Sequence, residues 1–145
     1  MALPVFVDTA FLVAPANRHD VYHTKAVELS LKFENQPLVL TDAVLLEVGN
    51  SLARGFRAEA VRLIDDLLAS EEVDLVRLSP VLFGQAFGLY REHQDKQWGL
   101  VDCVSFVVMR ERSLRQALTC DQHFRQAGFE ALMIEDSTSS SQILG

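Results

Sequence analysis

The sequence predicts an α/β fold in which a central parallel sheet of four to five short strands is flanked by helices. Short apolar runs alternate along the chain with longer stretches whose apolar residues recur at helical spacing. Parallel strands need crossover connections, and helices between the runs supply them. The chain has 145 residues, of which 49% are hydrophobic and 23% are charged, as is typical of one globular domain.

The first half of the chain contains two predicted strands and three predicted helices. A strand is expected at 3–7, where the apolar run is nearly continuous, as in a sheet buried on both faces. An amphipathic helix follows at 20–34 and ends before Pro37, and a second strand covers 38–40. Thr41 is the predicted N-cap of a helix that runs to about Arg54, with Gly55 as its stop. The next helix, at 58–70, has one apolar and one charged face.

The alternation continues in the second half. A third strand is expected at 73–78, after which Ser79 and Pro80 open a helix through 93. A polar break at 95–99 precedes a helix at 100–112, a strand at 117–120 and a brief helix to 127. Gly128 separates that helix from a last strand at 129–134. The domain is therefore expected to span 1–134, and the Ser- and Thr-rich residues predict a flexible tail at 135–145.

Composition and net charge exclude several classes of protein. No apolar run approaches the roughly 18 residues that a membrane span needs, and the N-terminal residues lack a signal-peptide pattern, so a cytoplasmic protein is expected. The net charge of −7 argues against a basic surface that coats nucleic acid, but it permits a nucleic-acid enzyme with a compact acidic site. Cys103 and Cys120 lie in apolar segments and are expected to be small, buried free thiols.

Two aspartates follow predicted strands. Asp8 ends the first strand, and Asp121 ends the strand at 117–120. Ligands of open parallel sheets bind beyond the carboxyl ends of the strands, so the two side chains are expected to converge. The alternative for each residue is to cap the helix that follows.

Two further carboxylates lie in unusually apolar helices. Glu47 is surrounded by apolar residues, and at helical spacing it shares one side of its helix with Asn50 and Arg54. Asp102 lies in the first turn of an equally apolar helix, where the alternative is favourable charge placement at a helix N-terminus. Four carboxylates in one pocket would repel one another unless a cation compensates. Oxygen ligands without a Cys or His at suitable spacing indicate Mg²⁺ or Mn²⁺.

Other motifs are absent or weak. The sequence has no Gly-x-Gly-x-x-Gly or Gly-x-Ser-x-Gly motif, which argues against dinucleotide binding and against a serine hydrolase elbow. A phosphatase of the haloacid dehalogenase type needs Asp-x-Asp after its first strand, and Ala10 occupies the third position here. His19 and His23 are expected on a solvated helix face, whereas His93 and His123 have no partner that the sequence reveals.

Four segments follow one another along the chain: VDTAFL at 7–12, TDAVLLEV at 41–48, WGLVDC at 98–103 and LTCDQHF at 118–124, the last followed by AGF at 127–129. In this order and at these intervals they resemble the PIN domain of the VapC-type toxin group, across residues 3–134. The resemblance implies a PIN-like fold and a Mg²⁺- or Mn²⁺-dependent endoribonuclease, the toxin of a type II toxin–antitoxin pair. An RNA substrate, a cognate antitoxin protein and a homodimer follow as expectations, and no membrane partner is expected.

Carried over by position, the resemblance assigns the catalytic, metal-binding cluster to Asp8, Glu47, Asp102 and Asp121, with Thr9 as a supporting hydroxyl. It implies hydrolysis without a protein nucleophile, leaving a 5′-phosphate and a 3′-hydroxyl. The residues expected to hold the RNA backbone are Asn50, Arg54 and Arg57, with Arg18 as a further candidate. The alternative is a catalytically weak or inactive PIN module that binds RNA or a protein partner.

The chain departs from the group in the segment before Asp102. Members commonly carry hydroxyl residues at the positions of Gly99 and Val101. Gly99 can still serve as an N-cap, but Val101 offers no hydroxyl to orient the cluster. Activity therefore depends on whether other groups orient Asp102.

Overall fold

The computed structural model describes residues 3–134 and confirms the α/β class. Five parallel strands form one sheet in the order β3-β2-β1-β4-β5. The strands are β1 (Val5–Val7), β2 (Leu38–Thr41), β3 (Val73–Val76), β4 (Gln116–Leu118) and β5 (Glu130–Ala131). The predicted tail at 135–145 lies outside the described residues.

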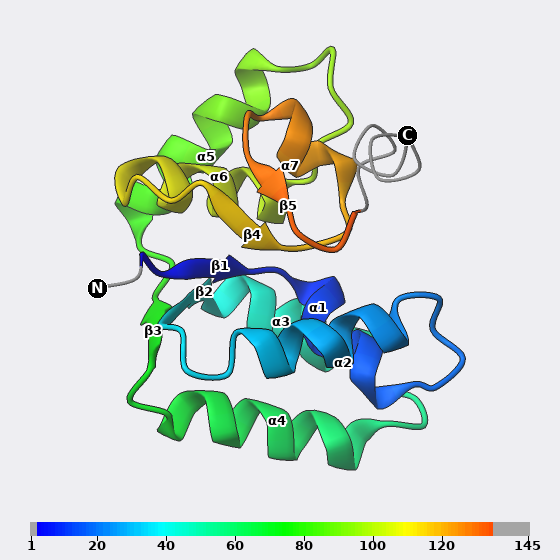
Figure 1. The fold of residues 1–145 in the computed structure, drawn as a ribbon. Helices are drawn as coiled ribbons and strands as arrows, with labels where there is room; N and C mark the ends of the chain where they lie inside the picture. Colours follow the sequence, from blue (N-terminus) through cyan, green and yellow to red (C-terminus); the bar gives the residue numbers. More distant parts are fainter. Residues whose placement is uncertain (1–2, 135–145) are drawn as a thin grey trace, which may run out of the picture.

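Seven α-helices and one 3₁₀ turn connect the strands of this part of the chain. They are α1 (Thr9–Val13), η1 (Ala14–Ala16), α2 (His23–Lys32), α3 (Asp42–Ser51), α4 (Arg57–Ala69), α5 (Pro80–Glu92), α6 (Leu100–Glu111) and α7 (Gln122–Gln126). In Figure 1, helices α1 to α4 lie below β1, and helices α5 to α7 lie above it. Within residues 3–134, none of these helices combines the length and apolar character that crossing a membrane requires.

The centre of the sheet is a switch point. From β1, the chain builds β2 and β3 on one side and β4 and β5 on the other. Crevices at such points, beyond the carboxyl ends of the strands, are where open α/β sheets bind ligands. Asp8 directly follows β1, and Asp121 lies three residues after the neighbouring β4.

Local chemistry explains where the helices begin. The Thr41 hydroxyl accepts a hydrogen bond from the Val44 amide at 3.2 Å, and the Ser79 hydroxyl accepts one from the Leu82 amide at 3.0 Å. Both are the predicted N-caps. Gly55, with φ of 86°, stands in the left-handed region between α3 and α4, where a residue with a side chain would be strained.

Two expectations about the first half were wrong. Helix α3 ends at Ser51, so Arg54 lies beyond the helix and does not continue the row of Glu47 and Asn50. Residues 9–16 form α1 and η1, which the sequence did not predict because a five-residue helix is too short to display a period. Pro15 would break the interior of an α-helix, but it is compatible with the first turn of the 3₁₀ helix.

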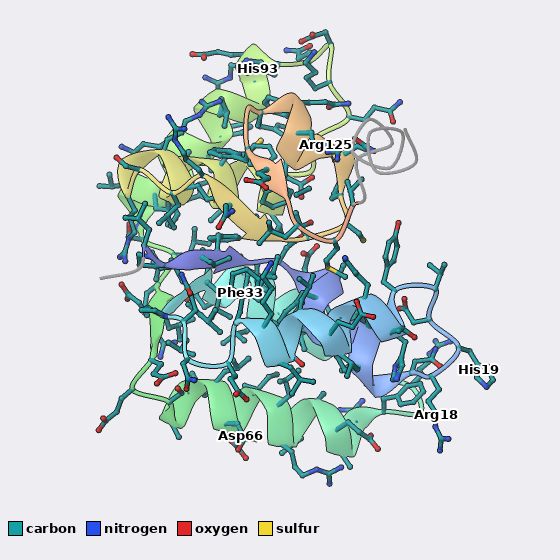
Figure 2. All side chains as sticks on the ribbon, viewed as in Figure 1. Arg18, His19, Phe33, Asp66, His93 and Arg125 are labelled. Carbon is teal, nitrogen blue, oxygen red and sulfur yellow. The ribbon has the colours of Figure 1, made fainter. Side chains whose placement is uncertain are left out.

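Aromatic packing holds α6 and α7 together. Phe106 of α6 meets Phe124 of α7 edge-on, with ring centroids 5.0 Å apart, and Trp98 packs edge-on against Phe106 at 5.0 Å. Phe106 and Phe124 are fully buried. This core fixes the N-terminal ends of the two helices, next to Asp102 and Asp121. Figure 2 shows that Arg18 and His19 project from the loop before α2, where both are exposed. His19 is thus solvated as predicted, but it lies in a loop, and His23 at the start of α2 is half-buried, so the two do not share a solvated helix face.

Candidate functional site

Four carboxylates from separate elements surround one pocket of about 440 Å³. Asp8 follows β1, Glu47 lies on α3, Asp102 lies in the first turn of α6, and Asp121 caps α7. The lining residues are Asp8, Thr9, Ala10, Glu47, Ser51, Asp102, Cys120 and Asp121. The pocket therefore lies at the carboxyl ends of β1 and β4, where a ligand crevice is expected.

Asp8 is the most buried of the four, with 7% of its surface exposed. Its side chain does not cap α1; instead, the Thr119 hydroxyl donates to Asp8 Oδ2 at 2.7 Å. The pKa of Asp8 is raised to about 6, chiefly by burial and also by the charges of Asp102 and Asp121, and the Thr119 hydrogen bond opposes this rise. In the metal-free protein, Asp8 is therefore ionised at neutral pH at a cost in stability.

Asp102 and Asp121 combine two roles. The Gly99 amide donates to Asp102 Oδ2 at 3.0 Å, and the His123 amide donates to Asp121 Oδ1 at 2.8 Å, so each carboxylate caps its helix. Both also line the pocket. Burial raises the pKa of Asp102 above its ordinary value, and the charge of Asp121 adds to the rise. The capping alternative is correct for Asp121, and Asp102 lies in the first turn of α6 as its own alternative supposed. Both roles are compatible with a place in the acidic site.

Glu47 is oriented by Thr9, whose hydroxyl donates to Glu47 Oε1 at 2.8 Å. This bond links α1 to α3 beside the pocket, which both residues line. The residues predicted to hold the RNA backbone do not line this pocket. Neither Asn50, Arg54 nor Arg57 is among the residues that line the pocket, and Arg57 borders a separate hollow beside α4.

The hydrogen bonds that hold these carboxylates leave ligand atoms available. They go to one oxygen of each carboxylate, namely Oδ2 of Asp8, Oε1 of Glu47, Oδ2 of Asp102 and Oδ1 of Asp121. Each group is thus oriented through one oxygen and retains a second. Oriented carboxylate oxygens are the donors that Mg²⁺ and Mn²⁺ prefer, so the residues present fit such an ion.

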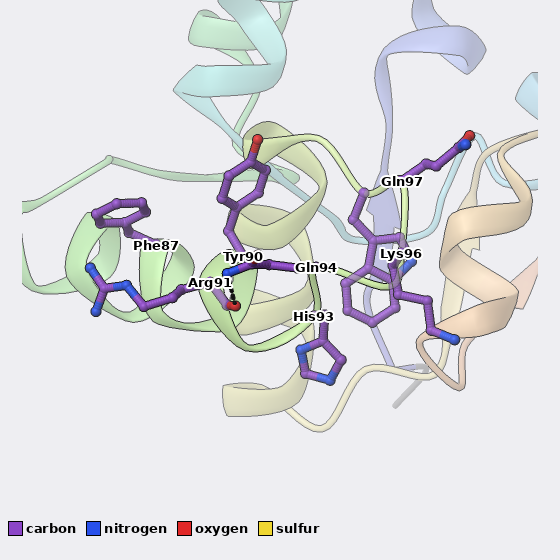
Figure 3. Close-up of a pocket in the computed structure, with 8 residues that line it drawn as sticks. Phe87, Tyr90, Arg91, His93, Gln94, Lys96 and Gln97 are labelled. Carbon is purple, nitrogen blue, oxygen red and sulfur yellow. Dashed lines mark hydrogen bonds between the residues drawn. The ribbon is translucent and has the colours of Figure 1, made fainter.

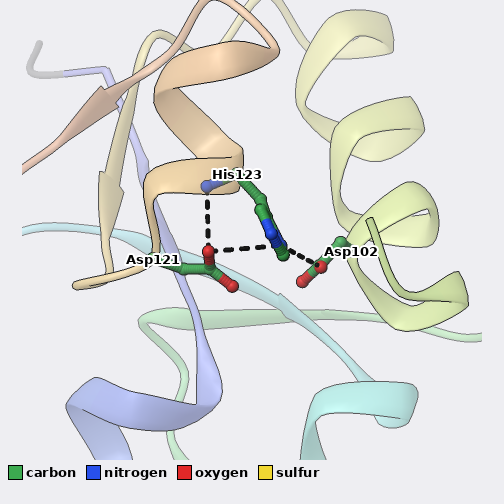
Figure 4. Close-up of side chains that lie close together, drawn as sticks. All are labelled: Asp102, Asp121 and His123. Atoms are coloured by element: carbon green, nitrogen blue, oxygen red, sulfur yellow. Dashed lines mark hydrogen bonds and ion pairs between the residues drawn. The ribbon is translucent and has the colours of Figure 1, made fainter. Parts of the chain in front are cut away.

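His123 is the site residue that the sequence reasoning missed. Its Nδ1 lies 3.1 Å from Asp102 Oδ2 and 3.3 Å from Asp121 Oδ1 (Figure 4). One ligand atom from each of these three residues falls within 4.8 Å of the others. The imidazole bridges the carboxylates at the starts of α6 and α7. The neighbouring Asp121 is visible in the sequence, but Asp102 is 21 residues away and comes into contact only through the fold.

We expect His123→Ala to weaken Mn²⁺ affinity or activity by roughly 10- to 100-fold, as loss of a group that orients metal ligands commonly does. His123→Asn keeps a side-chain N–H donor and should recover most of the loss. The measurement is the dependence of the RNA cleavage rate on Mn²⁺ concentration, with the exposed His19→Ala variant as control. Equal Mn²⁺ dependence in wild type and His123→Ala would show that the bridge is dispensable.

The segment in which the chain departs from the group that it resembles still orients Asp102. Gly99 serves as the predicted N-cap of α6, with extended backbone, and its amide together with His123 orients the carboxylate. Val101 is half-buried and packs against the core, and its carbonyl accepts a hydrogen bond from the Ser105 hydroxyl at 3.2 Å. Two donors therefore hold Asp102 without a hydroxyl at position 101.

Both cysteines are free, but they differ in exposure. Cys103 is buried as expected, and burial raises the pKa of its thiol to about 11. Cys120 is only half-buried and lines the acidic pocket, which corrects the expectation of a buried thiol. Burial raises the pKa of Cys120, and the charges of Asp8 and Asp121 raise it further. Its thiol therefore stays protonated near neutral pH and is a poor nucleophile.

Comparison with known proteins places the chain among nucleases. It matches no family model. It is 31% identical over 126 residues to the 23S rRNA-specific endonuclease VapC20 of Mycobacterium tuberculosis, in strains CDC 1551 / Oshkosh and ATCC 25618 / H37Rv alike. The match covers 86% of this chain and 95% of that protein.

A solved structure supports the same relationship. The crystal structure of M. tuberculosis VapC20, described as a sarcin–ricin loop cleaving toxin, superposes with a TM-score of 0.76 at 29% identity, over 86% of this chain and 95% of that one. Fold, length and sequence thus agree across nearly the whole described chain, which excludes the haloacid dehalogenase alternative. The chain belongs to the VapC-type family of PIN-domain toxin endoribonucleases.

Proposed function

We propose that this protein cleaves RNA with a divalent cation, Mg²⁺ or Mn²⁺, held by Asp8, Glu47, Asp102 and Asp121. The observation that supports the proposal is the convergence of four carboxylates on one pocket, with the hydrogen bonds of each directed to a single oxygen. A bound cation would supply Lewis-acid chemistry to the phosphodiester and lower the pKa of an attacking water.

The chain's own residues orient this reaction. Thr119 holds Asp8, Thr9 holds Glu47, and His123 holds Asp102 and Asp121. Cys120 keeps its proton and supplies no nucleophile. Attack by water leaves a 5′-phosphate and a 3′-hydroxyl on the two product strands.

A requirement for metal is the first expected result. Protein stripped of metal should not cleave RNA, and millimolar Mn²⁺ or Mg²⁺ should restore cleavage, measured as product on a denaturing gel. Undiminished cleavage in excess EDTA would contradict the proposal. Metal-independent RNA binding without cleavage under any of these conditions would instead support the inactive PIN module.

Structured ribosomal RNA is the proposed substrate class. The support is similarity to VapC20, a 23S rRNA-specific endonuclease whose crystal structure is described as that of a sarcin–ricin loop cleaving toxin. The same assay with ribosomal RNA, transfer RNA and unstructured RNA distinguishes the classes. A single cut confined to ribosomal RNA is expected. The proposed place of action is the cytoplasm, where ribosomes are found.

A homodimer is proposed as the working unit. Arg54 and Arg57 are exposed beside α3 and α4, and pairing of two subunits would place both copies along one RNA groove. Val81, 70% exposed on α5, and Leu46, 70% exposed on α3, offer apolar surface for such pairing. Sedimentation at micromolar concentration should show a species of twice 16.2 kDa. A species of monomer mass alone would contradict the dimer.

A cognate antitoxin is the proposed protein partner. A mostly apolar hollow of about 380 Å³ is lined by residues of α1, η1, α2 and α4 together with Leu52. Its lining residues are Phe11, Leu12, Pro15, Ala16, Ser30, Leu52, Glu59 and Leu63. Such a hollow suits the apolar face of a partner segment. It adjoins α1, which carries Thr9, so an occupant would lie close to the acidic pocket.

A further inference from the structure

A second pocket lies at the C-terminal end of α5, outside the acidic site. It has a volume of about 570 Å³ and is bounded by the last turns of α5 and the segment that leads to α6. In Figure 3, Tyr90 and His93 stand on the α5 side of this pocket, and Lys96 and Gln97 stand on the connecting segment. The full lining is Phe87, Tyr90, Arg91, His93, Gln94, Lys96, Gln97 and Trp98.

The lining differs in charge from the rest of the molecule. The protein carries a net charge of −7, yet this pocket is lined by two cations and no carboxylate. The cations are Arg91 and Lys96. The pocket is also lined by aromatic rings and by the side-chain amides of Gln94 and Gln97. Cations contact phosphates, ring faces stack on bases, and amides pair with base edges, so the lining has the three kinds of group that bind a nucleotide.

The walls of the pocket are held in place. The His93 ring stacks on Trp98 with centroids 4.9 Å apart, and the His93 Nδ1 lies 3.0 Å from the Leu89 carbonyl oxygen. The Arg91 guanidinium lies over the Phe87 ring, 4.7 Å from its centroid. A base that enters therefore meets a surface that is already ordered.

Tyr90 and Lys96 are the groups free to contact a ligand. The Tyr90 ring is 44% exposed at the mouth of the pocket. Lys96 pairs with Asp95 at 3.4 Å, but both side chains are exposed, and such pairs contribute little. Lys96 can therefore exchange Asp95 for an RNA phosphate at little cost in free energy.

Trp98 connects this pocket to the acidic site. Its indole N–H donates to Gln126 Oε1 at 2.9 Å on α7, the helix that Asp121 caps. Trp98 also precedes Gly99, whose amide holds Asp102. Lys96 is six chain steps from Asp102, which span at most about 21 Å, so an RNA strand bound at one pocket reaches the other within a few nucleotides.

We propose that the pocket at the end of α5 binds one nucleotide of the RNA substrate within a few nucleotides of the cleaved phosphodiester, with its base on Tyr90 and its phosphate on Lys96 and Arg91. The inference rests on the proposed function, since it takes RNA as the substrate. It assigns substrate recognition to residues outside the acidic cluster.

Binding measured without cleavage tests this assignment. The probe is a fluorescein-labelled single-stranded RNA of about twelve nucleotides, long enough to cover both pockets, titrated in excess EDTA and followed by anisotropy. Tyr90→Ala should weaken the Kd about tenfold, whereas Tyr90→Phe, which keeps the ring, should stay within about twofold of wild type. Lys96→Gln should reduce the slope of log Kd against log salt concentration by about one. Lys32→Gln on α2 removes the same charge away from the pocket and should leave this slope unchanged.

The outcomes separate this proposal from the proposed function. A Tyr90→Ala variant that is folded by circular dichroism and binds RNA as tightly as wild type would overturn the pocket assignment. So would a variant whose sedimentation changes while its RNA affinity does not, because the pocket would then be a protein interface. Wild-type protein that binds RNA through Tyr90 but cleaves none with Mn²⁺ would contradict the proposed function and leave the pocket assignment intact.

Discussion

Replacement of Asp8 by Asn should abolish RNA cleavage and, in the metal-free protein at pH 7, raise the melting temperature by several degrees. Loss of one ligand and of its charge should reduce kcat/KM by at least about a hundredfold. The stability gain follows from burial, because Asp8 is 7% exposed and its pKa is raised from 3.8 to about 6. Ionisation at pH 7 therefore costs about 3 kcal/mol, which Asn avoids while its amide oxygen still accepts the Thr119 hydrogen bond.

The matched control is Asp66→Asn on the exposed face of α4, marked in Figure 2. It removes the same charge far from any carboxylate of the pocket and should change neither the melting temperature nor cleavage. A loss of several kcal/mol in Asp8→Asn would contradict the expectation, because Asp8 would then be chiefly a structural residue.

The stability of the metal-free protein should fall as pH rises from about 4 to 7. The pKa of Asp8 in the folded state, about 6, lies above its ordinary value of 3.8, so the folded protein binds this proton more tightly than the unfolded chain. The resulting contribution is fully present below pH 3.8 and is lost as pH rises through about 6. Burial moves the pKa of Asp102 in the same direction.

Urea unfolding of wild type and Asp8→Asn over this pH range isolates the effect. The difference in free energy of unfolding should change by about 2 kcal/mol in favour of the variant between pH 4 and 7. Saturating Mn²⁺ should restore the free energy of unfolding of the wild type at pH 7, because the ion binds the folded state and not the unfolded state. A difference that is constant over this range would show that Asp8 keeps an ordinary pKa.

The sequence predicted the strands because each is a short apolar run bounded by a turn or cap. Five strands and six of the seven helices in residues 3–134 lie where the periodicity places them. The positions of Asp8 and Asp121 followed from the rule that ligands gather at the carboxyl ends of parallel strands. Where the chain carries a strong local signal, such as Thr41 or Ser79 before an apolar helix, the structure agrees.

The contacts that orient the site could not be predicted in this way. Thr119 lies 111 residues from Asp8 in the chain, and Thr9 lies 38 residues from Glu47. Both pairs meet only because the strand order places β1 beside β4 and α1 against α3. Arg54 was misplaced for a related reason, because helix α3 ends three residues before it and the glycine at 55 marks the end of the turn that follows.

An anomalous difference map from a crystal grown with Mn²⁺ tests the proposed metal site most directly. A peak is expected within the pocket, bounded by Asp8, Glu47, Asp102 and Asp121, and it should be absent from crystals of Asp8→Asn. A peak elsewhere, or an empty pocket at a Mn²⁺ concentration that activates RNA cleavage, would contradict the assignment of the catalytic cation to these four carboxylates.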